Sequence, residues 1–152
     1  MLRARTIVVA ALAAPLVACG GDDPTGPALC TDDTGTVTVT VSDATPPVFS
    51  WDPACAVAVF LIEAPGDVWY IGSDDTLWDD PAQANVVTPP VTYGVVPSGA
   101  EEFTGPLPLT PGVAGTVILW RILPDGSTAS CLSDTFGAFG NVCVLAIHEF
   151  IP

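Results

Sequence analysis

The sequence predicts an all-β sandwich of about eight short antiparallel strands. Helical periodicity is absent, and Val, Ile, Thr and aromatic residues gather in short runs along the chain. Clusters of Gly, Pro, Asp and Ser separate these runs at intervals of about 8–15 residues, which is typical of two packed antiparallel sheets.

The individual runs differ in the strength of their strand signal. Residues 36–41 alternate Thr and Val, which puts the valines on one face. Residues 56–63 are apolar almost throughout and indicate a central strand buried on both faces, and a Pro65-Gly66 turn joins them to residues 67–72 as a hairpin. Residues 115–123 form a second strongly apolar strand, and loops are expected at 73–85 and 98–105. The expected strands are 36–41, 48–51, 56–63, 67–72, 91–96, 115–123, 127–132 and 141–151.

The first residues have the order of an export signal. Arg3 and Arg5 form a short positive segment, and an apolar run from Ile7 to Leu16 follows, interrupted by Pro15. This run is about half of the roughly 20 residues that a helix needs to cross the hydrocarbon core. A cleaved signal peptide is therefore expected over residues 1–18, rather than a permanent transmembrane helix.

The signal ends in Leu16-Val17-Ala18-Cys19, which resembles the lipobox of bacterial lipoproteins. The resemblance implies cleavage before Cys19, diacylglycerol on its sulfur and acylation of the new N-terminus. Two or three acyl chains hold a protein at a membrane for practical purposes permanently. Gly20 follows the cysteine where Asp would favour the inner membrane in many Gram-negative bacteria, so the resemblance implies the outer membrane. The alternative is an ordinary signal peptide cut near Ala18.

Composition then bounds the rest of the chain. Residues 19–34 are rich in Gly, Pro, Asp and Thr and predict a flexible linker, and residues 35–152 are long enough for one domain. Beyond the signal, Arg121 is the only basic residue against 17 acidic ones. This balance excludes nucleic-acid binding and docking on anionic lipid through a basic patch. The same charge favours a soluble, monomeric domain.

Four cysteines remain after Cys19, and an even number in an exported chain indicates two structural disulfides. Three connectivities are open. Short loops favour Cys30–Cys55 and Cys131–Cys143, the second pair facing each other across a hairpin near Gly137. A metal site is the rival interpretation, but the chain has no Cys-x-x-Cys motif and a single histidine, His148. No cofactor is expected.

Two motifs within the predicted sandwich resemble those of fibronectin type III-like domains in bacterial surface proteins. Pro47-Val48-Phe49-Ser50-Trp51-Asp52-Pro53 is similar to the second strand of that family, and Leu109-Thr110-Pro111-Gly112 is similar to the entry to its sixth strand. The tyrosine that usually follows the second motif is missing, and residues 141–151 extend past the normal end. The resemblance therefore implies an immunoglobulin-like sandwich with a binding, spacing or adhesion role and no catalytic residues.

One loop concentrates the polar and aromatic candidates for ligand binding. The acidic residues gather around Trp78 in the order Asp-Asp-Thr-Leu-Trp-Asp-Asp, and carboxylate oxygens are the ligands that Ca²⁺ prefers. The loop lacks the alternation and glycine of an EF-hand, so a solvated acidic loop is the simpler interpretation. Trp69, Tyr70 and Trp78 are candidates for stacking on sugar rings, although one of the first two should face the core. The weak metal candidates are Asp74, Asp75, Asp79 and Asp80.

The residue pattern favours a non-catalytic protein. His148 and Glu149 are neighbours on a predicted strand and therefore point to opposite faces. Ser127, Ser130 and Ser133 have no base in evident reach. The expected function is that of a lipid-anchored envelope module with a protein or glycan partner. A glycan-binding or calcium-stabilised adhesion module using the Asp74–Asp80 loop is the alternative, and a small hydrolase is the third possibility.

Overall fold

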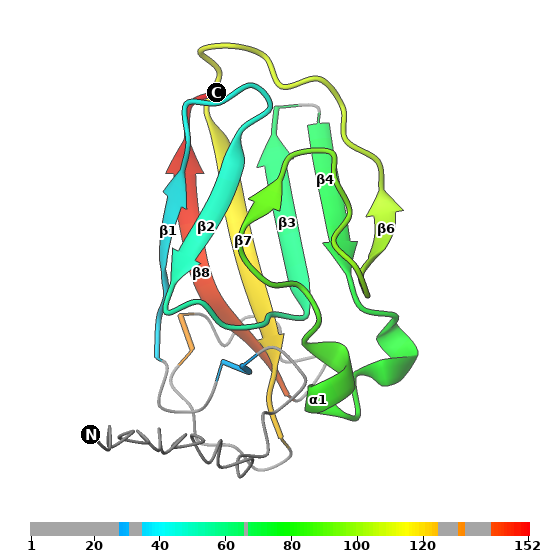
Figure 1. Ribbon diagram of the computed structural model, residues 1–152. Coiled ribbons are helices and arrows are strands. Elements are labelled where there is room, and N and C mark those ends of the chain that lie inside the picture. The colour runs from blue at the N-terminus through cyan, green and yellow to red at the C-terminus, as the bar shows by residue number, and fades with distance from the viewer. Residues whose placement is uncertain (1–27, 31–34, 66, 125–130, 133–140) are drawn as a thin grey trace, which may run out of the picture.

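The computed structural model describes residues 28–30, 35–65, 67–124, 131–132 and 141–152 and shows two antiparallel sheets packed face to face (Figure 1). The three-stranded sheet has the order β1-β2-β5, with β1 at Thr38–Val41, β2 at Val48–Asp52 and β5 at Val91–Thr92. The five-stranded sheet has the order β6-β4-β3-β7-β8. Its strands are β3 (Val59–Ala64), β4 (Asp67–Gly72), β6 (Glu101–Thr104), β7 (Gly115–Ile122) and β8 (Val142–Phe150). The predicted all-β sandwich is confirmed.

The core lies between the two sheets because each strand alternates its side chains between two faces. Phe49 and Trp51 of β2 point inward, at 0% and 3% exposure, and meet the equally buried Phe60 of β3. The ring centroids of Phe49 and Phe60 are 5.3 Å apart in an edge-to-face arrangement, which aromatic quadrupoles favour. Burying one such ring stabilises a fold by about 1.5–3 kcal/mol.

Three sequence predictions need correction in the described residues. The segment 98–105, expected to be a loop, contains β6, whose four residues are all exposed and pair with β4 through the backbone. The strand expected at 91–96 ends at Thr92 because the chain turns at Gly94, where φ is +77°. The acidic loop at 73–85 contains two short helical segments, η2 (Asp75–Leu77) and α1 (Pro81–Ala84). The strand expected at 127–132 lies mostly outside the described residues.

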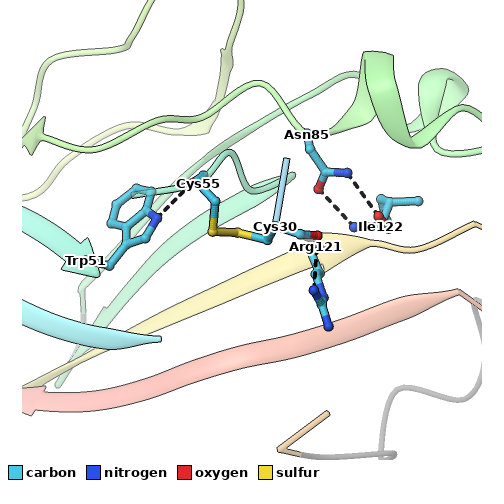
Figure 2. The surroundings of a disulfide bond; sticks show 6 residues. All are labelled: Cys30, Trp51, Cys55, Asn85, Arg121 and Ile122. Atoms are coloured by element: carbon cyan, nitrogen blue, oxygen red, sulfur yellow. Dashed lines mark hydrogen bonds between the residues drawn. A yellow bond between two sulfur atoms is a disulfide. The ribbon is translucent and has the colours of Figure 1, made fainter. Parts of the chain in front are cut away.

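One end of the sandwich is held together by a disulfide and polar contacts (Figure 2). Cys30 is bonded to Cys55, and the Trp51 indole N–H donates to the Cys55 carbonyl at 2.8 Å. Arg121, fully buried in β7, donates from Nη1 to the Cys30 carbonyl at 3.0 Å. Asn85, just after α1, both accepts from the Ile122 N–H and donates to its carbonyl.

The fold begins inside the segment expected to be linker. Ala28 accepts a hydrogen bond from the Ala56 N–H at 2.8 Å, and Leu29 forms a parallel bridge with Ala56. The second disulfide joins Cys131 to Cys143 of β8, so the structure has the pairing that short loops favour. The Cys30 end also carries α1, whereas the last residue lies at the opposite end (Figure 1).

Candidate interaction surface

A continuous row of apolar side chains crosses the outer face of the five-stranded sheet. In the strand register, Leu61 lies opposite both Tyr70 and Ile118, and Ile118 lies opposite Ile147. Phe103 of β6 extends the row, because its ring centroid lies 4.7 Å from that of Tyr70. We call these five residues the apolar row, and it reaches every strand of the sheet.

The apolar row is buried in its middle and open at its ends. Leu61 is only 9% exposed because it packs in a second hydrophobic cluster together with Tyr70 and Ile118. Phe103 is 45% exposed and Ile147 is 56% exposed. The outer face of an antiparallel sheet is normally polar, so an apolar row that reaches all five strands, with exposed residues at both ends, is a candidate contact surface.

Carboxylates border the apolar row on both sides. Glu63 and Glu149, both exposed, lie opposite Thr116 in the next register row. On the other side, Asp75 lies close enough to Tyr70 to act on its titration. The pKa of the Tyr70 hydroxyl is raised, first by partial burial and second by the negative charge of Asp75. The row is therefore an apolar strip within a negative surface.

Two of the four carboxylates in the acidic loop accept hydrogen bonds from neighbouring residues of the same loop. Asp74 Oδ1 accepts from the Thr76 N–H at 2.8 Å and from its hydroxyl at 2.7 Å, and these bonds lower the pKa of Asp74. Asp80 caps α1, accepting from the Gln83 side-chain amide at 2.6 Å and from the Ala82 N–H at 3.0 Å. These bonds lower the pKa of Asp80 in the same way.

The other two carboxylates of the loop, Asp75 and Asp79, are exposed. In the part of the chain that the structure describes, no three His, Cys, Asp or Glu side chains come together as a metal would require. The geometry of the loop therefore gives the calcium interpretation no support.

The three aromatic candidates from the sequence lie in different environments. Trp69 is 0% exposed in the core and donates its indole N–H to Glu102 at 2.9 Å, so it cannot stack on a ligand. Tyr70, its neighbour, faces the opposite side, as strand alternation predicts. Trp78 is half-buried against the second hydrophobic cluster and donates to the Ser73 hydroxyl at 3.2 Å. Only Tyr70 belongs to the apolar row.

The remaining candidates do not form a catalytic group among the described residues. His148 lies opposite Val117, a core residue, whereas Glu149 lies opposite Thr116 on the other face. The two side chains therefore point apart, as the sequence predicts. Cys19, Ser127, Ser130 and Ser133 lie outside the described residues.

Sequence reasoning missed four members of the apolar row. Phe103 belongs to a segment that was expected to be a loop. The other three lie in apolar strands whose two faces look alike in sequence: Leu61, Ile118 and Ile147. Ile118 is followed by Leu119, Trp120 and Arg121, so alternation gives no sign of which residues face outward. The signal lies in the register between strands, which a single sequence does not supply.

Comparison of the chain with protein-family models, curated proteins and solved structures found no match. In the described residues, none of the helices combines the length and hydrophobicity required to span a membrane.

Proposed function

We propose that the protein is a lipid-anchored, non-catalytic module of the bacterial envelope that binds another protein through the apolar row. The apolar row is the observation that carries this proposal. It offers contact area from five strands, with exposed anchors at Phe103 and Ile147 and a more buried centre. Aromatic side chains of this kind are enriched in protein interfaces, whereas charged ones are depleted from interface centres.

An immunoglobulin-like fold of the fibronectin type III kind is part of the proposal. The strand order supports this fold. The sheet β1-β2-β5 packs against the sheet β4-β3-β7-β8, and β6 is added at the β4 edge of the second sheet. The Phe49 and Trp51 side chains of the first motif are core residues, and Leu109 of the second motif packs against the core. Tyr93 at the end of β5 donates its hydroxyl to the Leu107 carbonyl at 2.6 Å. This contact anchors the connection before β7, where the family uses the missing tyrosine.

The lipid anchor would orient the domain. Eight residues separate Cys19 from Ala28, and the nine steps from one residue to the other span at most about 30 Å. The end that carries the Cys30–Cys55 disulfide would therefore lie nearest to the membrane. The apolar row crosses the side of the sandwich, so it would remain open to partners in the envelope.

The chemistry of the surface defines the partner. Glu63, Glu149 and Asp75 border the row, and the one basic side chain after residue 5, Arg121, is buried. A partner with an apolar ridge flanked by Lys or Arg would bury the row and match its charge. A second copy of the acidic domain would oppose like charges across the contact.

Site-specific photo-crosslinking in intact cells tests the binding role. We expect a photoreactive phenylalanine at position 103 or 147 to form a discrete adduct, and the same group at Thr40, an exposed residue of the three-stranded sheet, to form none. Ile118→Lys should abolish the adduct formed from position 103, because it puts a charge in the centre of the row. Equal adducts at all three positions, or survival of the adduct from position 103 in Ile118→Lys, would contradict the proposal.

Mass spectrometry of the mature N-terminus tests the anchor separately. We expect a thioether-linked diacylglycerol on Cys19, and release of the Cys19→Ser variant from the membrane fraction. An unmodified mature protein in the soluble fraction would show that Cys19 is not lipidated.

Glycan recognition is the second candidate, and one contact favours it. The half-buried Tyr70 ring and the exposed Phe103 ring lie side by side near Asp75, an arrangement able to stack on a sugar. Binding to a glycan array that is lost in Tyr70→Ala and retained in Trp78→Ala would support this surface. Loss in Trp78→Ala alone would instead favour the Asp74–Asp80 loop.

A further inference from the structure

The two edge strands of the five-stranded sheet are protected to very different degrees. β6 has four residues, all exposed, and two of them are glutamates, which discourage pairing with another strand. β8 has nine residues and contains no Lys, Arg or Pro, and its Ile147 side chain is 56% exposed. A long, largely apolar edge strand is a template for pairing.

Among the described residues, backbone contacts occupy only the first part of this edge. The Leu132 N–H donates to the Val144 carbonyl at 3.0 Å, and the Val37 N–H donates to the Leu145 carbonyl at 3.4 Å. Backbone groups alternate in direction along a strand, so the N–H and C=O groups of Ile147 and Glu149 point to the same side as the Leu145 carbonyl. Within the described residues no other strand pairs with them there.

The nearest strand, β1, does not close the gap. Val37 touches β8 just before β1 begins, and from Thr38 onward the chain pairs with β2. β1 therefore remains in the three-stranded sheet, whereas β8 belongs to the five-stranded sheet. Although β1 and β8 are neighbours, no described strand hydrogen-bonds the two sheets together along this side.

A groove of about 310 Å³ lies along this side of the sandwich. The buried side chains of Val37, Val39 and Ala146 form an apolar part of its wall, and the exposed Ile147 forms its rim. In the described residues its lining is Thr36, Val37, Thr38, Val39, Leu132, Ala146, Ile147 and His148. The groove thus combines apolar wall residues with backbone groups of Ile147 and Glu149 that no described strand pairs with.

We propose that this groove binds an extended peptide segment of another protein, which adds as a strand to β8. The unpaired groups of Ile147 and Glu149 would pair with its backbone, as in strand addition to other sheet edges. Apolar side chains at every second position would face Val39 and Ala146, and Lys or Arg would suit the outward positions beside Glu149. A second copy is a poorer occupant because two strongly acidic domains would meet.

This inference adds a second contact to the proposed binding role and stands largely on different residues. Ile147 and Glu149 border both surfaces, whereas Phe103 and Ile118 belong only to the apolar row. The Ile118→Lys variant therefore separates the two proposals: it should abolish crosslinking from position 103 and leave peptide binding to β8 unchanged.

The test uses the mature protein and the synthetic peptide Lys-Thr-Val-Thr-Val-Thr-Val-Lys. We expect saturating peptide to slow amide hydrogen exchange at Ile147 and Glu149 at least tenfold, with no change at Glu102 or Thr104 of β6. The same peptide with methylated backbone nitrogens keeps its side chains but cannot donate, and it should not bind. A version with Glu in place of both Lys should bind more weakly.

A protein variant gives an independent readout. Proline is tolerated on an edge strand where the N–H lacks a strand partner, so Ile147→Pro should fold, as judged by thermal unfolding, and lose at least tenfold in peptide affinity. Equal binding of the methylated peptide, or protection confined to β6, would overturn the proposal. If a concentration-dependent dimer protected Ile147 and Glu149 from exchange without peptide, the occupant of the groove would be a second copy of the chain, and the proposal of a peptide partner would be wrong.

Discussion

At the residue scale, Asn85 shows how one buried amide substitutes for strand pairing. It is 3% exposed, and its side chain holds the Ile122 backbone from both sides, accepting at 3.0 Å and donating at 2.9 Å. The same amide nitrogen donates to the Pro81 carbonyl at 2.7 Å. Asn85 therefore fastens α1 to the end of β7 without a further strand.

Asn85→Asp tests this role. The carboxylate can still accept from the Ile122 N–H, but it cannot donate to the Pro81 and Ile122 carbonyl oxygens. These two oxygens then face a buried negative charge, so we expect the free energy of unfolding to fall by about 3 kcal/mol at pH 7. Burial and the carbonyls raise the folded-state pKa of the new carboxyl above its unfolded value of about 3.9. The stability deficit should therefore shrink as the pH falls toward 4 and grow as the pH rises. Denaturant unfolding at several pH values measures this deficit, with the exposed Thr40→Ala as control. A deficit that did not change with pH would contradict the prediction.

Tyr70 reports on the electrostatics of the apolar row. Burial and Asp75 both disfavour the phenolate, so the pKa of Tyr70 lies above its ordinary value of 10.0. We expect Asp75→Asn to lower that pKa only in part, because burial is the larger cause and remains. Because Tyr70 ionises more easily in the unfolded chain than in the folded one, the folded state should lose stability as the pH rises above about 10. Ultraviolet titration measures the shift, with Asp79→Asn as the control; an unchanged Tyr70 titration would show that Asp75 is not its neighbour in solution.

At the element scale, strand prediction succeeded where side chains carry the pattern. The alternation at Thr38–Val41 gives inward valines as expected, and the apolar segments gave β3 and β7 within a few residues. β6 was not predicted because it pairs with β4 through backbone groups, while its four residues are all exposed and show no apolar alternation. Val95 and Val96 suggested a strand, yet they lie exposed after the turn at Gly94.

The candidate surface was less predictable than the fold. The acidic loop and the aromatic residues were expected to be candidates for ligand binding. Asp74 and Asp80 instead cap short helical segments, and Trp69 is buried in the core. The apolar row depends on which residues of neighbouring strands lie opposite each other. This register depends on packing across the whole sheet, so it cannot be predicted from the sequence of a single strand.

The backbone of the neighbouring strand approaches Gly72 closely, so a side chain at this position should destabilise the fold. A Cβ on Gly72, the last residue of β4, would lie 2.6 Å from the Ala58 carbonyl oxygen. The backbone there must shift, so Gly72→Ala should cost about 1–3 kcal/mol. Gly105→Ala is the matched control, because its Cβ would meet nothing closer than a Glu102 carboxylate oxygen at 3.8 Å. Thermal unfolding of both variants measures the difference, and equal stabilities would contradict the close approach.

At the scale of the whole molecule, the dominant property is unbalanced charge. The formal net charge is −14, and removal of the predicted signal would make it more negative because Arg3 and Arg5 would leave. Arg121, the remaining cation, is buried in β7 and donates to the Cys30 carbonyl, so a single positive charge stands against 17 acidic residues. One disulfide joins Cys30 to Cys55, just before β3, and the other joins Cys131 to Cys143 in β8. Both restrict the unfolded chain and therefore oppose the destabilising effect of this repulsion.

Salt should therefore stabilise the mature domain. The Debye length falls from about 30 Å at 0.01 M to about 3 Å at 1 M ionic strength, so repulsion between separated carboxylates is screened. We expect the melting temperature to rise by a few degrees over that range, corresponding to about 1 kcal/mol. Most of the rise should occur below about 0.2 M, because screening saturates, whereas salting-out effects continue to grow with concentration. The double variant Glu63→Gln/Glu149→Gln should start from a higher melting temperature and gain less from salt. A melting temperature that falls with salt in the wild type would mean that attractive pairs, rather than repulsion, dominate the surface.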